Sequence, residues 1–146
     1  MSILKIDGVD GDVHRPKKFA TLFATAAIAK GDVVMINTGT TTNGSGMHVK
    51  KSDADDSVLA IGIAETAASA AGDTVRVQVA GFNANATASS GAIIAVNAAV
   101  GCDTAGKVEL VGDVDANQKA FAVCIKAFAD GGSDGEIYIY DHGFYG

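Results

Sequence analysis

The chain has 146 residues, a formal net charge of −6, 18 glycines, a single proline and no tryptophan. This length suits one domain with a buried core. The acidic balance argues against nucleic acid as a partner, because phosphate binding needs a basic surface. No apolar run approaches a membrane span, and residues 1–12 lack the apolar segment of a secretory signal. Small and β-branched residues separated by glycine turns favour an all-β domain of short strands.

Residues 1–18 differ from the rest, and we predict an extended N-terminal arm there, followed by a single β domain over 19–146. The arm is rich in glycine and aspartate and ends in Arg15, Pro16, Lys17 and Lys18. Pro16 blocks a helix and biases the preceding residue to an extended conformation. An ordinary frayed terminus is the alternative. The aspartates lack the closing glutamate of an EF-hand, so we expect no metal.

Short strands are predicted along the body of the chain, at 19–25, 32–36, 47–51, from residue 60 to the connection at 64, and at 74–80, 92–96, 107–111, 120–127 and 136–141, with 92–96 beginning the second pseudo-repeat. The first has apolar residues on both faces and is expected to be buried on both sides. In Thr74–Ala80, the three valines should face the core, while Thr74, Arg76 and Gln78 should face solvent. The alanine-rich segment 64–71 is short and lacks an apolar stripe, so we expect a connection there and not a helix.

An internal duplication is predicted from the match between Ala60–Phe82 and Ala122–Phe144 at an offset of 62 (122 − 60 = 62). The pseudo-repeats cover about 26–82 and 92–144. A weak self-match is also expected of any β-protein rich in glycine, alanine and valine. The fold class that follows is all-β, a compact antiparallel barrel or sandwich with two related halves.

The core is predicted from the alternating apolar positions. It comprises Leu22, Val34, Ile36, Ile61, Ile63, Val75, Val77, Val79, Ile94, Val123, Ile125, Ile137 and Ile139. In the last strand Tyr138 and Tyr140 should point outward. Cys102 and Cys124, the only cysteines, are expected to be reduced and buried.

Catalytic motifs are not recognisable in this sequence. It has no phosphate-binding loop, no nucleophile elbow and no metal-type cysteine or histidine spacing, so no cofactor is expected. His14, His48 and His142 are widely separated. An acid–base pair that meets only in space would escape this search, so a small enzyme on a β scaffold stays an alternative.

Three stretches together resemble the small capsid decoration proteins of tailed bacteriophages, also called cement or head-stabilisation proteins. They are AAIAKGDVV at 26–34, LAIGIA at 59–64 and AGDTVRVQVAG at 71–81. The resemblance implies a non-enzymatic, all-β virion protein on the capsid exterior, made in the host cytoplasm. It also implies binding to the major capsid protein and association of copies, with a homotrimer favoured.

Capsid-contact residues are expected in two places. The arm with Arg15, Pro16, Lys17 and Lys18 could add a strand to a capsid sheet and meet acidic surface. Tyr138 and Tyr140 suggest a contact surface on the body, since tyrosine is enriched at interface hot spots, unless they pack beneath a loop or the C-terminal tail. A phage fibre or adhesion module that binds carbohydrate is the other alternative function.

Overall fold

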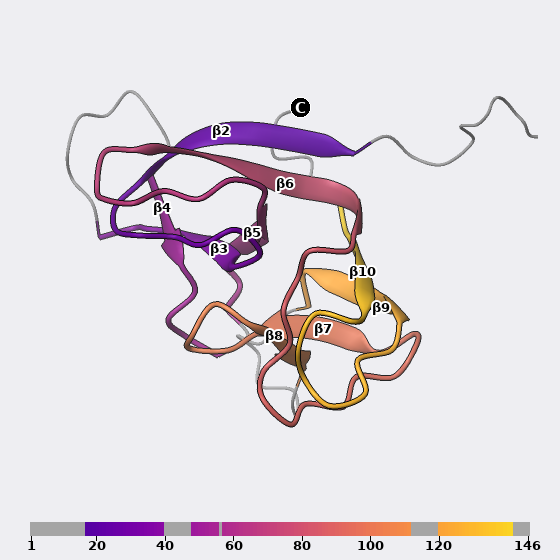
Figure 1. The fold of residues 1–146 in the computed structure, drawn as a ribbon. Coiled ribbons are helices and arrows are strands. Elements are labelled where there is room, and N and C mark those ends of the chain that lie inside the picture. Colours follow the sequence, from indigo (N-terminus) through magenta and orange to yellow (C-terminus); the bar gives the residue numbers. More distant parts are fainter. Residues whose placement is uncertain (1–16, 40–47, 56, 112–119, 142–146) are drawn as a thin grey trace, which may run out of the picture.

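The computed structural model describes residues 17–39, 48–55, 57–111 and 120–141, and these residues form nine β-strands and no helix (Figure 1). The strands are β2 (Lys18–Ala24), β3 (Val33–Ile36), β4 (His48–Lys51), β5 (Ala60–Ala64), β6 (Thr74–Asn83), β7 (Ala99–Cys102), β8 (Val108–Leu110), β9 (Ala122–Lys126) and β10 (Glu136–Ile139). The all-β prediction is confirmed. The alanine-rich segment after β5 is a connection, as expected, with turns and one bridge to Ile28.

Five strands in the order β2-β4-β3-β5-β6 form a closed barrel, because β2 also pairs with β6. The closing pair is antiparallel and runs from Lys18 opposite Ala80 to Phe23 opposite Thr74. The other barrel pairs are antiparallel too, except β2 with β4. The chain reaches β4 through β3, and this crossover allows the parallel pairing. The predicted barrel of short strands is therefore confirmed, with one parallel pair.

β6 joins the barrel to the second half of the chain (Figure 1). Six of its first seven residues, all but Val79, pair with β2, and its end, Gly81–Asn83, pairs with β10. Gly81 has a φ of 96°, a backbone conformation that strains residues with a Cβ. The strand can therefore turn at Gly81 from one group of strands to the other. Beyond it the sheet continues in the order β10-β9-β7-β8.

The pairing order β4-β3-β5-β6 of the barrel recurs as β8-β7-β9-β10 in the second half. An isolated antiparallel bridge joins Ile28 to Ala68 beside the barrel, and an equivalent bridge joins Ile94 to Phe128. The first partners are 66 residues apart (94 − 28 = 66) and the second partners 60 (128 − 68 = 60). The matching pairs therefore do not follow the single offset of 62, because the loops of the two halves differ in length.

Two hydrophobic clusters form the core. One fills the barrel and includes Leu22, Val34, Val75 and Val77, and the other lies within the second half and against the barrel. The predicted core positions are buried except Ile36, Val123 and Ile125, which are only partly buried.

The errors on β9 have a simple geometric cause. Ala122 and Cys124 occupy the core face of the strand, so the alternating Val123 and Ile125 lie on its outer face. Two β-branched apolar residues spaced two apart are also what a core-facing pair would look like in the sequence. The sequence therefore placed the strand correctly but assigned its two faces the wrong way round.

Two further predictions about faces were wrong. The first strand is buried on one side only, with Leu22 and Ala24 inward and Phe23 42% exposed, because its outer face is uncovered on the barrel surface. Gln78 was expected in solvent but is 1% exposed. Its amide nitrogen donates hydrogen bonds to the backbone oxygens of Ala80 (3.0 Å) and Phe82 (2.7 Å), on either side of the turn at Gly81.

Candidate functional site

The basic residues predicted at the end of the arm lie partly within the described structure. Arg15 and Pro16 fall outside the described residues. Lys17 and Lys18 are exposed at the start of β2, where Lys18 pairs with Ala80 of β6. A Cβ at Gly81 would come within 3.1 Å of the Lys17 Cα, so the chain enters the barrel directly against the turn in β6.

An ion pair fixes this entry point to the end of the last strand. The Lys18 Nζ lies 2.5 Å from Oδ2 of Asp141, although 123 residues separate the two in sequence. The two side chains are 47% and 40% exposed, so solvent screens the pair and its contribution to stability is about 0–1 kcal/mol. The contact places the start of β2 beside the residues that follow β10, at one corner of the molecule.

The two predicted tyrosines differ in how much surface they offer. Tyr138 is partly buried and packs edge-on against Phe82, with ring centroids 5.0 Å apart and an interplanar angle of 74°. Tyr140 is 40% exposed, and its backbone nitrogen donates to the Phe121 oxygen at 3.0 Å. The outward orientation of both residues is confirmed, and Tyr140 presents the more accessible ring.

The structure thus brings the described members of both predicted contact groups together with Phe82. We call this set the β6–β10 corner: Lys17, Lys18, Phe82, Tyr138 and Tyr140. Phe82, 41% exposed, was not among the predicted residues. The glycine–phenylalanine pair that ends both predicted repeats was a usable signal for it. The corner combines two exposed lysines with exposed aromatic rings, and it is the aromatic rings that are enriched at protein-contact surfaces.

A buried polar network shapes this corner from below. Asn83 Nδ2 donates to Gln78 Oε1 at 3.0 Å, and Asn83 Oδ1 accepts from the backbone nitrogens of Asn85 (2.8 Å) and Ala86 (3.0 Å). Both side chains are almost fully buried. Since buried polar groups without partners are costly, these bonds favour one shape of the chain around Gly81.

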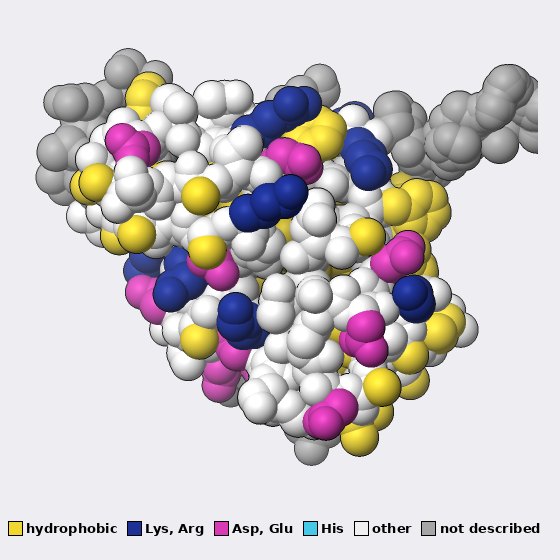
Figure 2. Space-filling model, viewed as in Figure 1, with side chains coloured by type: hydrophobic (Ala, Val, Ile, Leu, Met, Phe, Trp, Pro, Cys, Tyr) yellow, Lys and Arg dark blue, Asp and Glu magenta, His cyan; other side chains and the backbone are white. Residues whose placement is uncertain are grey.

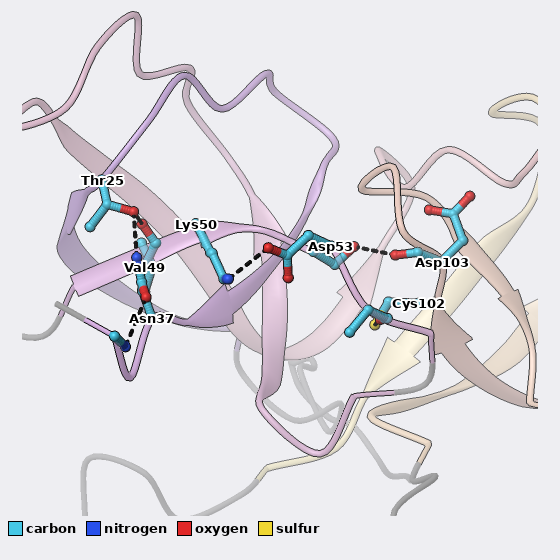
Figure 3. Close-up of polar contacts among 10 residues, drawn as sticks. Thr25, Asn37, Val49, Lys50, Asp53, Cys102 and Asp103 are labelled. Carbon is cyan, nitrogen blue, oxygen red and sulfur yellow. Dashed lines mark hydrogen bonds and ion pairs between the residues drawn. The ribbon is translucent and has the colours of Figure 1, made fainter.

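A second polar cluster lies where the second half meets the barrel, and Figure 3 shows part of it. Ser52, buried at the end of β4, donates to the backbone oxygen of Asp103 at 2.8 Å. The Asp103 carboxylate accepts from Ser89 Oγ (2.6 Å) and from the backbone nitrogens of Ala105 and Lys107. These contacts occupy both carboxylate oxygens. Asp103 therefore stabilises its own turn and the contact between the second half and the barrel.

The remaining ionisable groups do not converge on one point. Lys50 and Asp53 form a pair at 2.6 Å near this seam (Figure 3). In the described part of the chain, no three histidine, cysteine or acidic side chains are placed to hold a metal ion. Burial raises the pKa of the Cys124 thiol, which disfavours the nucleophilic thiolate. Within the described residues there is no helix that could cross a membrane.

The fold is an all-β barrel that β6 extends into a second group of strands. The exposed aromatic and basic corner is suited to contacts with other proteins. The model of the phage cement protein family matches residues 14–139. The chain therefore belongs to the phage cement protein family, a family of structural proteins, which confirms the resemblance found in the sequence.

Among solved structures, the fold is similar to the crystal structure of the head fibre gp8.5 N base of bacteriophage phi29. The TM-score is 0.58 at 12% identity, and the match covers 86% of this chain and 96% of that one. At this identity the likeness concerns the fold. A search of curated proteins found no match.

Proposed function

We propose that this protein binds the outer surface of a phage capsid and stabilises contacts between major capsid subunits without catalysing a reaction. Membership of the phage cement family over residues 14–139 carries this proposal. The fold shared with a phage head fibre base supports a place on the virion exterior. We also propose that copies of the chain associate, with three favoured by the resemblance, after synthesis in the host cytoplasm.

The β6–β10 corner supports contact with the capsid through the arm. Lys18 is held in β2 and paired with Asp141, so the described chain begins at a defined point on the barrel. The arm proposed for residues 1–18 would add a strand to a neighbouring capsid sheet, where backbone hydrogen bonds supply affinity. Arg15 and the exposed Lys17 would then meet acidic capsid surface, with Tyr140 beside them.

A non-enzymatic role agrees with the way the described polar residues are used. Asp103 and Asn83 are engaged by turn and seam contacts, and the Cys124 thiol is buried with a raised pKa. These groups are engaged in contacts within the fold.

Co-sedimentation with expanded capsids that lack this protein tests the proposal. The full chain should bind to saturation, whereas a chain that begins at Lys17 should bind at least tenfold more weakly. Starting at Lys17 keeps Lys18 and its partners, so the barrel stays closed. Binding unaffected by this truncation would move the contact to the body, and failure of the full chain to bind any capsid form would reject cement function.

A matched pair of substitutions tests the body contact. Tyr140→Ala should weaken capsid binding because it removes an exposed ring at the corner. Leu110→Ala removes a comparably exposed apolar side chain, 52% against 40%, from β8, three places beyond β10 in the strand order, and should leave binding unchanged. Equal loss in the two variants would argue against the corner as the contact.

A further inference from the structure

An apolar row crosses the outer face of the second half. Phe82 is opposite Tyr138, Tyr138 is opposite Val123, and Val123 is opposite Ala99. Residues opposite one another in neighbouring strands share a face, and at about 4.8 Å per strand the row is roughly 14 Å long. Its alternating neighbours, among them Ile137 and Cys124, are fully buried, so the row faces outward.

The barrel contains the equivalent row, and there it is covered. Gln78 is opposite Ile63, and Ile63 is opposite Val33. These residues correspond to Tyr138 (138 − 78 = 60), Val123 (123 − 63 = 60) and Ala99 (99 − 33 = 66) by the offsets that relate the bridges of the two halves. All three barrel residues are 0–1% exposed.

The second half of the chain is what covers the barrel row. Val33 and Ile63 belong to the same hydrophobic cluster as Val100, Phe121 and Ile137. The Val33 nitrogen also donates to the Gly106 oxygen at 2.8 Å. Within this chain, therefore, the face in question is buried by a neighbouring unit with the same pairing order.

We propose that the apolar row is the surface through which a second copy of this chain docks. The barrel shows that a unit of this fold can cover such a face. In the described part of the second half, the equivalent apolar residues remain partly or fully exposed. The inference rests on the proposed association of copies. It assigns the Phe82 and Tyr138 rings to the contact between copies and leaves Lys17, Lys18 and Tyr140 of the corner for the capsid.

The charge distribution supports a copy of the same chain as the partner. Two copies with a net charge of −6 repel one another, so they are best joined through a face without acidic excess. The row has no ionisable side chain at neutral pH. At its borders Glu136 is opposite Lys126, and Lys18 is paired with Asp141, so the border charges balance.

The apolar surface also extends beside β9. Ile93 and Val96 are 72% and 51% exposed, and their segment is joined to β9 by a bond from the Asn97 nitrogen to the Cys124 oxygen (2.8 Å). At the offset of 66, the barrel has the smaller Ala27 in place of Ile93 and the charged Lys30 in place of Val96, so the second half is the more apolar at these two positions. Figure 2 shows hydrophobic side chains gathered along the right-hand edge, from the end of β6 past β9. Exposed apolar surface of this kind marks an interaction site.

Sedimentation velocity of the full chain tests the proposal. The wild type should sediment as a multimer, and Val123→Lys should raise the dissociation constant at least 100-fold, because it places a charge in the row. Thr21→Lys is the control, since Thr21 is an exposed strand residue on the outer face of the barrel. Circular dichroism should show that both variants fold.

Should Val123→Lys fail to fold, Ala99→Lys makes the same test at an exposed row position. A wild type that stays monomeric, or a multimer unchanged by row substitutions, would overturn the inference. A Val123→Lys variant that stays multimeric but loses capsid binding would also overturn it and assign the row to the capsid. Failure of the wild type to bind capsids, with the multimer intact, would reject only the proposed cement function.

Discussion

Phe128 fills the space above Gly135 so tightly that a Cβ at position 135 would lie 2.5 Å from the ring carbon Cδ1 of Phe128. Phe128 is fully buried. In the barrel the equivalent positions hold Ala68 and Val75, 60 residues earlier in each case (128 − 68 = 60; 135 − 75 = 60). The barrel therefore has a small residue followed by a larger one at these two positions, whereas the second half has a large residue followed by glycine.

This relationship predicts a size-compensating pair of substitutions. Gly135→Val should destabilise the fold by about 1–3 kcal/mol through overpacking, and Phe128→Ala by about 3–5 kcal/mol through a cavity. The double variant has the small and large residues in the same places as the barrel pair. Its loss in free energy of unfolding should therefore be smaller than the sum of the two single losses. Urea unfolding of the four proteins gives the coupling energy. Strictly additive losses would contradict the equivalence of the two positions.

The sequence predicted those parts of the fold that depend on local patterns. Val75, Val77 and Val79 alternate with polar residues and are buried as expected. The two faces of β9 were misassigned because Val123, although it lies in the outer apolar row, is apolar. In the sequence, an apolar residue on the outer face cannot be told from one in the core. The corner depends on Lys18 meeting Asp141 across 123 residues, a contact that no spacing rule encodes.

The buried amide of Gln78 predicts a sensitive isosteric change. Gln78→Glu keeps the shape but replaces the donor to the Ala80 and Phe82 oxygens with an acceptor, in a site with almost no solvent access. We expect a loss of about 2–4 kcal/mol at neutral pH in chemical unfolding. Thr74→Val, at an exposed position of the same strand, is the control and should change stability by less than about 0.5 kcal/mol. Equal stability of the Gln78→Glu variant and the wild type would show that the network does not hold the turn at Gly81.

The two cysteines predict slow thiol chemistry in the folded protein. Cys102 and Cys124 are both buried, and burial raises the pKa of the Cys124 thiol. With a disulfide-exchange reagent near pH 8, the native protein should react at least 100-fold more slowly than the protein in denaturant. A Cys124→Ala variant separates the two thiols. A native thiol that reacts at the denatured rate would show that its site opens readily to solvent.

The turn before β6 predicts an acid-dependent stability effect. Asp73 Oδ2 accepts hydrogen bonds from Ser69 Oγ (2.9 Å) and from the backbone nitrogens of Ser69 and Ala70 (3.0 Å each). These bonds, led by the Ser69 hydroxyl, lower the Asp73 pKa from its ordinary value of 3.8. A carboxyl whose pKa is lowered by folding stabilises the native state above its unfolded pKa, and this effect is lost as the pH falls through the folded pKa.

Asp73→Ala should therefore lower Tm by roughly 1–3 °C at pH 6, and this difference should shrink progressively as the pH is brought below 3.8. Asp130→Ala, an exposed aspartate in the corresponding connection of the second half, serves as the comparison variant. Thermal unfolding by circular dichroism over pH 2–6 measures both. A difference between wild type and Asp73→Ala that stays constant, or grows in acid, would mean that the ionised carboxylate does not hold this turn.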